Sequence, residues 1–499
     1  MKIQDLLSLA LNKKKLISRY RSSLSLLNWD QEVNMPVDGA EARGDVFGDL
    51  VGIVSDLEND EEFKQAIKFL NENSGGLSDI DNRYVKKIFL DSDRSWKIPN
   101  NLSIEMARIS IIAQTKWSEA KSIGDFSMFA PYLEEIISLK QKEIEALGYI
   151  DHPYDALLNQ YEPNLNVRDM DAIFKKSIPK LKEIRDRYYE KSSNAQKFRS
   201  SIAKQRSLIN KLSSYIGFDF NKGRIDIGKH PATEFIHNND VRIIARFDEH
   251  SISTGIFLTL HELGHALYYQ NINPDYVDTP FYEGASTAVH EAMARLLENN
   301  IAKSPYFLTG KFDEFKCHLD ESDGIVISDL IKSINSISNS PLRFDADEIT
   351  YVFHIFIRYE IEKKLIDGTL CVADVPKFWN KAFSDLLNVS ISNDRDGCLQ
   401  DVHWSCCLIG YFPTYYVGTI YAASIYAIMK NEVPNFKELL SSGDFHKITD
   451  WLSENIYTHG AKYSPEELME MVTMKTSLED MLPDFLSYIE CKYNDIYKN

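Results

Sequence analysis

The sequence predicts a mainly α-helical protein with one small antiparallel β-sheet. Apolar residues recur at helical spacing along most of the 499-residue chain, and 44% of the residues are hydrophobic, enough for a large core. Strand signals are scarce, and the loops between the periodic segments are brief. We therefore expect a single, mostly helical domain that covers residues 1–499.

Amphipathic stripes identify the individual helices. Residues 131–149 are the clearest case, because aliphatic side chains share one face, Pro131 stands near the start and Gly148 follows as a C-cap. The first residues of the chain show the same rhythm, and their apolar run is too broken by charge for a signal peptide. Similar stripes occur at residues 170–190, 201–215, 351–366 and 464–472.

The sheet is predicted from two short segments rich in isoleucine and valine, residues 223–229 and 240–247. Residues 230–239 between them read as a loop. We expect the two segments to pair antiparallel, just before the apolar stretch 257–270.

Composition limits the partners of this chain. Its formal net charge of −18 disfavours binding to a nucleic-acid backbone or to an anionic membrane surface. Residues 404–429 carry no charged side chain and could span a bilayer by length, but Pro413 and five tyrosines favour a buried helix. The six cysteines include no CxxC pair, so we expect reduced thiols in a cytoplasmic protein.

The segment FLTLHELGHALYYQ (257–270) contains His261, Glu262 and His265 in the order HExxH. Histidines four residues apart share one helix face and can offer two imidazole nitrogens to one metal ion. The glutamate is rotated by about 100° and can take a proton from a metal-held water without binding the metal. This chemistry requires the HExxH spacing and predicts a catalytic zinc.

A plain helix with two histidines is the alternative. A chain of this composition would contain about 0.02 such motifs by chance. The preceding residues are apolar, and burying two histidines and a glutamate is costly when nothing binds them. Gly264 also costs about 1 kcal/mol relative to alanine in a helix, so its presence indicates that something approaches closely. We therefore predict a metal site.

A zinc site of this type needs a third protein ligand and one open position. The next apolar helix, residues 286–300, carries Glu291, which lies 26 residues after His265. A second helix that crosses the first could deliver this carboxylate. A salt-bridged surface glutamate is the alternative, and His290 is the competing ligand.

Several stretches of the sequence together resemble one family, the thermostable Taq-type metallocarboxypeptidases, related more distantly to angiotensin-converting enzyme and neurolysin. GCLQDVHW (397–404) fits the family pattern G-x-x-Q-D-x-H-W at every fixed position. The other matching stretches are WDQEVNMPVDGAEAR (29–43), HPYDALLNQYEP (152–163), DVRIIARF (240–247), HEAMARLLEN (290–299) and LRFDADEITY (342–351).

The resemblance implies a function and a site. It implies a zinc carboxypeptidase that removes single residues from the C-terminus of peptides, with one Zn²⁺ per chain and Co²⁺ as a possible substitute. The implied metal ligands are His261, His265 and Glu291, and the implied general base is Glu262. The implied fold is a helical body with a deep active-site cleft, the sheet along one wall, and N-terminal helices (about 1–120) partly covering the mouth. Relatives are usually cytoplasmic homodimers.

Three positions depart from the family pattern. Ile244 replaces a threonine of the D-x-R-x-T stretch, and Ala292 and Met293 replace a serine and a glutamine after the HE pair. We expect all three near the cleft, where they would affect the rate or the side-chain preference but leave metal binding intact.

Further residues are candidates for substrate contacts. His403, Tyr411 and Tyr415 could stabilise the tetrahedral oxyanion, with core packing as the alternative for the tyrosines. A carboxypeptidase must also capture the terminal carboxylate, for which arginine is well suited. Arg343 is the first choice and Arg242 the second.

Structural salt bridges with Asp345, Asp347 or Asp240 are the alternative for these arginines.

Two other functions stay open. One is a zinc endopeptidase or dipeptidase with the same metal centre, and the other is a non-catalytic peptide-binding scaffold.

Overall fold

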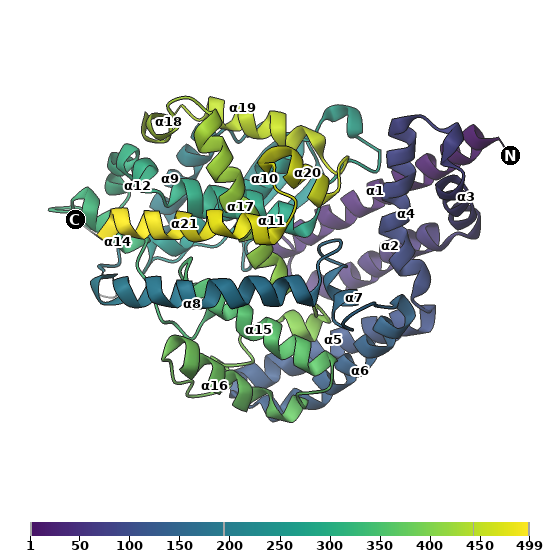
Figure 1. Ribbon diagram of the computed structural model, residues 1–499, viewed down its shortest axis with the longest axis horizontal. Coiled ribbons are helices and arrows are strands. Elements are labelled where there is room, and N and C mark those ends of the chain that lie inside the picture. Colours follow the sequence, from purple (N-terminus) through teal and green to yellow (C-terminus); the bar gives the residue numbers. More distant parts are fainter. Residues whose placement is uncertain (1, 193–194, 443, 498–499) are drawn as a thin grey trace. The chain divides into compact units, whose positions relative to one another are not determined.

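The computed structural model describes residues 2–192, 195–442 and 444–497 (Figure 1). The chain forms two compact units, and each is assembled from three separate stretches of sequence. The first unit comprises Met1–Trp96, Lys197–Leu330 and Ile425–Met474, and the second comprises Lys97–Gln196, Ile331–Ser424 and Lys475–Asn499. A single domain over residues 1–499 stays a prediction.

The first unit begins with the helices α1 (Ile3–Val33), α2 (Ala40–Asn59), α3 (Glu61–Glu72) and α4 (Asp79–Lys97). The short helix α3 illustrates why they form. Asp60 accepts a hydrogen bond from the Phe63 amide at its N-terminus, and Phe63, Ile67 and Leu70 fall on one stripe. This stripe packs with Leu7 of α1 and with residues of α4 in one buried cluster.

The sheet has three strands in the order β1-β3-β2, where β1 is Gly223–Ile227, β2 is Ala232–His237 and β3 is Asp240–Ala245. The expected antiparallel pairing of the two outer segments is wrong, because β1 and β3 are parallel. The predicted loop 230–239 instead contains β2, which turns back through a tight connection and pairs antiparallel with β3. Since β2 takes one edge of β3, β1 must take the other, and the sheet is mixed.

The helix α10 (Ile252–Gln270) carries the HExxH motif. Ser251 caps it by accepting a hydrogen bond from the Thr254 amide. It packs against β2 and β3, against α9 (Ile202–Ile216), and against α11 (Thr287–Arg295) with its π-helical extension η5 (Leu296–Ala302). The remaining helices of this unit are α12 (Pro305–Gly310), α13 (Phe312–Cys317), α18 (Phe436–Ser442), α19 (His446–Asn455) and α20 (Pro465–Thr473).

The second unit is also helical, and its long helices α8 (Val167–Ser192) and α21 (Leu478–Tyr497) run side by side (Figure 1). Its other helices are α5 (Asn100–Ile123), α6 (Ala130–Leu147), α7 (Asp155–Leu158), α15 (Thr350–Ile366) and α16 (Val375–Leu387). Three helices have residues in both units: α14 (Ile327–Ile334), α17 (Phe412–Glu432) and α4, whose last residue, Lys97, belongs to the second unit. The five helical stripes predicted from the sequence all lie in helices, at α6, α8, α9, α15 and α20.

The uncharged stretch 404–429 falls largely in α17, most of whose residues are buried, as expected for a core helix. Across the described ranges, no helix has the length and apolar character that a membrane crossing requires.

Candidate metal centre

The three predicted metal ligands come together in the first unit. His261 and His265 lie one turn apart on α10, and Glu291 lies on α11. The Nε2 atoms of the two histidines are 3.6 and 3.9 Å from the same oxygen of Glu291, Oε2. The three ligand atoms all lie within 4.8 Å of one another, so they could hold one metal ion. Two imidazoles and a carboxylate form a donor set typical of catalytic zinc.

Gly264 explains how the two helices come this close. A Cβ atom at this position would lie 2.5 Å from the backbone oxygen of Met293 and 2.6 Å from the Cα atom of Ala294. Any side chain here would push α11 away from α10. The absence of a side chain at Gly264 therefore lets α11 pack close enough to α10 for Glu291 to reach the two histidines.

A buried network of charges surrounds the ligands. Glu298, on η5, accepts a hydrogen bond of 3.1 Å from Nδ1 of His261. Arg295 donates to Oε1 of Glu291 at 2.6 Å and lies 3.4 Å from Glu298, while Lys303 donates to Glu298 at 2.7 Å. This arrangement directs Nε2 of His261 and Oε2 of Glu291 toward the common point.

The electrostatics of this network favour a cation. Burial alone would lower the pKa of His261, but Glu291 and Glu298 raise it. Burial would likewise raise the pKa of Glu298, but Lys303, His261 and Arg295 hold it well below the usual range. Glu298 is therefore ionised, and a positive charge is stabilised at His261, where a metal ion would replace a proton.

Glu262 is held by a strand that the sequence did not reveal. Its side chain is half-buried, and the loss of solvent around the carboxylate raises its pKa. The hydroxyl of Thr233, on β2, lies 2.8 Å from Oε2 of Glu262 and 2.8 Å from the backbone oxygen of the same residue. The signal that could have identified β2 is the run TEFI (233–236), which is rich in strand-forming residues and precedes the two asparagines of the turn.

His290, the competing ligand, does not join the three. Its Nδ1 atom faces Nδ1 of His265 at 3.1 Å, on the side of that ring away from Glu291.

Arg343 lies in the second unit, at the start of the short helix η6 (Arg343–Asp345), and is 5% exposed. Its partner is neither Asp345 nor Asp347 but Asp401, which accepts from Nε of Arg343 at 2.9 Å. Arg358 donates to the other oxygen of Asp401 at 2.7 Å. One carboxylate therefore serves two buried guanidinium groups.

Arg242 has a different environment. It forms two hydrogen bonds with Asp240, at 2.8 and 2.9 Å, and its guanidinium lies 4.2 Å from the ring centre of Trp29. This is the structural salt bridge that the sequence offered as the alternative to substrate binding.

His403, Tyr411 and Tyr415 form a ring cluster in the second unit. The ring centres of His403 and Tyr411 are 5.6 Å apart, and those of Tyr411 and Tyr415 are 5.3 Å apart. Burial, together with Arg343 and Arg358, lowers the pKa of His403 to about 4, although Asp401 opposes the shift. His403 is therefore neutral at pH 7 and keeps one N–H for donation.

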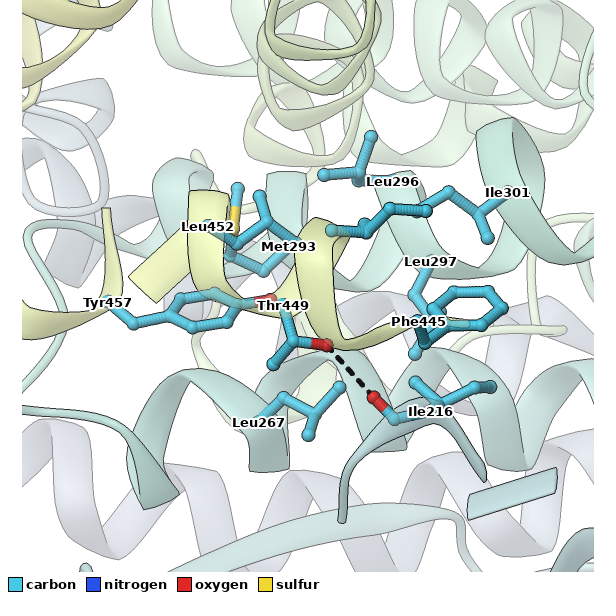
Figure 2. A pocket seen from close by; sticks show the side chains of 11 residues that line it. Ile216, Leu267, Met293, Leu296, Leu297, Ile301, Phe445, Thr449, Leu452 and Tyr457 are labelled. Carbon is cyan, nitrogen blue, oxygen red and sulfur yellow. Dashed lines mark hydrogen bonds between the residues drawn. The ribbon is translucent and has the colours of Figure 1, made fainter. Parts of the chain in front are cut away.

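The three departures from the family pattern are all buried. Ile244 and Ala292 are 0% exposed and Met293 is 1% exposed. Figure 2 shows Met293 in an apolar pocket of the first unit, with Leu267, Leu452 and Tyr457 among its lining residues. The Met293 side chain thus occupies apolar core rather than a polar surface.

Comparison with known proteins shows the family of this chain. A sequence model of the carboxypeptidase Taq (M32) metallopeptidases matches residues 10–493. The chain belongs to this family. Carboxypeptidase 1 of Bacillus subtilis is 34% identical over 488 residues, which are 97% of each chain. Thermostable carboxypeptidase 1 of Pyrococcus furiosus is 33% identical over 96% of this chain and 98% of its own. The solved M32 carboxypeptidase of Deinococcus radiodurans, 27% identical, superimposes with a TM-score of 0.93 over 99% of this chain and 100% of its own.

This chain is therefore a metallocarboxypeptidase of the M32 family, and its candidate metal site is formed by His261, His265 and Glu291.

Proposed function

We propose that this metallocarboxypeptidase uses one zinc ion to remove single amino acids from the C-terminus of peptides. The observation that carries the proposal is the convergence of His261, His265 and Glu291 on one point, next to Glu262 on the same helix. When bound, the zinc ion supplies a Lewis acid and lowers the pKa of a water molecule. Co²⁺ suits the same donors and is a possible substitute.

Glu262 is the proposed general base. Its carboxylate accepts the proton of the attacking water and passes it to the leaving amine. The hydrogen bond from Thr233 restricts the rotation of this carboxylate and leaves its other oxygen for the water. Burial raises the pKa of Glu262, which makes the group a stronger base once it is ionised.

Arg343 is the proposed site for the terminal carboxylate. Arg343, Arg358 and Asp401 together carry two positive charges and one negative charge, so this buried group has an excess of one positive charge. Nε of Arg343 donates a hydrogen bond to Asp401, and Nη1 donates one to the hydroxyl of Tyr351 at 3.0 Å. Among the described residues, none accepts a hydrogen bond from its Nη2 amino group, which leaves a charged donor for a substrate carboxylate. Arg242, already paired with Asp240, is the weaker candidate.

His403, Tyr411 and Tyr415 are proposed to donate hydrogen bonds to the oxyanion and to the substrate backbone. A neutral His403 suits this role, since it can donate without charge transfer. Their participation in the same reaction as the metal ligands rests on the family resemblance. The same resemblance supports a cytoplasmic homodimer, with the N-terminal helices over a cleft, and the six cysteines are free thiols.

The test uses short peptides, half with a free C-terminus and half amidated, incubated with the zinc-loaded protein and followed by mass spectrometry. Stepwise loss of single residues from the free-ended set alone is expected, and Glu262→Gln is expected to abolish it. Equal internal cleavage of both sets would mean an endopeptidase. No cleavage by protein with confirmed bound zinc would mean a non-catalytic scaffold.

A further inference from the structure

The two histidine ligands have different neighbours on their outer nitrogens. His261 has a carboxylate, Glu298, at 3.1 Å from its Nδ1 atom. His265 has another imidazole, because Nδ1 of His290 lies 3.1 Å from Nδ1 of His265. Glutamate is only an acceptor, whereas a histidine nitrogen can donate or accept, so the roles in the second pair must be derived.

Ligand geometry decides these roles. His265 presents Nε2 to Glu291, so this atom must keep its lone pair for a metal ion. A neutral imidazole carries its single proton on one nitrogen, which must then be Nδ1 of His265. Two N–H groups cannot face each other at 3.1 Å in a hydrogen bond. Nδ1 of His290 is therefore the acceptor, and the proton of His290 is on Nε2.

The surroundings of His290 hold its ring in this position. The ring centres of Tyr268 and Tyr269 lie 4.8 and 4.3 Å from that of His290. Tyr269 in turn stacks on Phe235 of β2 with a centre distance of 4.3 Å and an interplanar angle of 7°. The imidazole thus packs against two aromatic rings, one of which is supported by the sheet.

Gly284 provides the remaining space. A Cβ atom at this position would lie 2.3 Å from Cδ2 and 2.7 Å from Nε2 of His290. Nε2 is buried and has no hydrogen-bond partner in the described part of the chain. An unpaired buried N–H is costly, so the position of this ring is maintained for its other nitrogen, Nδ1.

We propose that His290 is a positioning residue for the metal site, which fixes the tautomer and the ring orientation of His265, and that Gly284 is required to seat it. The inference rests on the proposed metal site and deepens it. His290, the competing ligand, then has a different role. It accepts the Nδ1 proton of His265 and so leaves Nε2 of His265 free to bind the metal. Histidine ligands in metal sites generally donate their second N–H to such a partner, and its loss typically weakens metal binding by about 10–100-fold.

The experiment measures zinc affinity of the full-length protein by competition with a chromophoric chelator. His290→Phe keeps a ring against the two tyrosines but removes the acceptor, and should weaken zinc binding about 10–100-fold. His290→Asn places its amide oxygen close to the lost Nδ1 and should restore most of the affinity. Gly284→Ala should act like His290→Phe, because the added methyl group displaces the ring.

His237→Phe is the matched control, because His237 also packs against an aromatic ring, that of Tyr282, but contacts no ligand. Thermal unfolding of the metal-free variants separates lost affinity from lost folding, and the visible spectrum of the Co²⁺ forms reports the ligand geometry. Wild-type zinc affinity in a folded His290→Phe protein would overturn the proposal. Equal losses in the Phe and Asn variants would also overturn it, because an acceptor close to the lost Nδ1 atom would then make no difference. Since the readout is affinity, failure of the proposed peptidase activity would not be mistaken for failure of this role.

Discussion

Two buried groups of charges in this protein have opposite excess charges. The metal cluster of the first unit contains the carboxylates of Glu262, Glu291 and Glu298 and the cations Arg295 and Lys303, which leaves one negative charge. The arginine cluster of the second unit, Arg343, Arg358 and Asp401, has one positive charge in excess.

The comparison shows what an excess of buried charge of one sign indicates. Uncompensated charge is expensive away from water, so a fold retains it where a ligand supplies the opposite charge. The metal cluster accordingly suits a divalent cation, and the arginine cluster suits a carboxylate. Four predictions test this difference, from the largest expected effect to the smallest.

Asp401→Asn should have the largest effect. It removes the only carboxylate of the arginine cluster and leaves two guanidinium groups unpaired, so the free energy of unfolding should fall by about 3–5 kcal/mol in urea titrations at pH 7. Burial would raise the pKa of Asp401, but Arg343 and Arg358 hold it well below the usual range.

This pKa gives the prediction a pH dependence. A depressed carboxyl pKa contributes stability above the pKa of the unfolded chain, and this contribution is lost as the pH falls. The difference between wild type and Asp401→Asn should therefore be greatest near neutrality and narrow in acid. A constant difference from pH 7 to pH 3 would contradict the ionic role of Asp401.

Arg343→Lys should reduce kcat/KM about 10–100-fold on peptides with a free C-terminus, and amidated peptides should stay uncleaved, as with the wild type. Lysine keeps the charge but loses the planar pair of donors that binds a carboxylate. Arg358→Lys is the matched control, because it shares Asp401 but is 0% exposed. An equal fall in kcat/KM on free-ended peptides for both variants would remove the distinction between them.

Thr233→Val should reduce kcat about tenfold, because the hydrogen bond to the Glu262 carboxylate is worth about 1.5 kcal/mol. Thr233→Ser retains the hydroxyl and should stay close to wild type. Zinc affinity should not change in either variant. Steady-state kinetics with one free-ended peptide and chelator competition would check both points, and equal activity of the Val and Ser variants would contradict the role of Thr233.

Met293→Gln should have the smallest effect, a loss of about 1 kcal/mol in the free energy of unfolding with unchanged zinc affinity. The glutamine would place an amide in the apolar pocket beneath α19, where most lining residues cannot form hydrogen bonds (Figure 2). Increased stability would show that this position tolerates the polar residue of the family pattern.

Much of this protein could be predicted from local patterns. Helical periodicity located α6, α8, α9, α15 and α20, because each helix buries one stripe and each stripe is visible within about 20 residues of sequence. The spacing of His261 and His265 predicted a shared face, since four residues make about one turn. Glu291 was predicted as the third ligand from its spacing after His265 and from the family resemblance.

The tertiary structure decided the pairings between distant residues. Strand β2 lay in a segment read as a loop, and its insertion beside β3 made β1 parallel and brought Thr233 to Glu262. Asp401 lies 58 residues from Arg343 and 43 from Arg358, and no periodicity links them. The close approach at Gly264 and the contact of His290 with His265 likewise exist only once α11 packs on α10. Local sequence determines which face a helix buries, whereas the partner of each buried charge depends on which elements meet there.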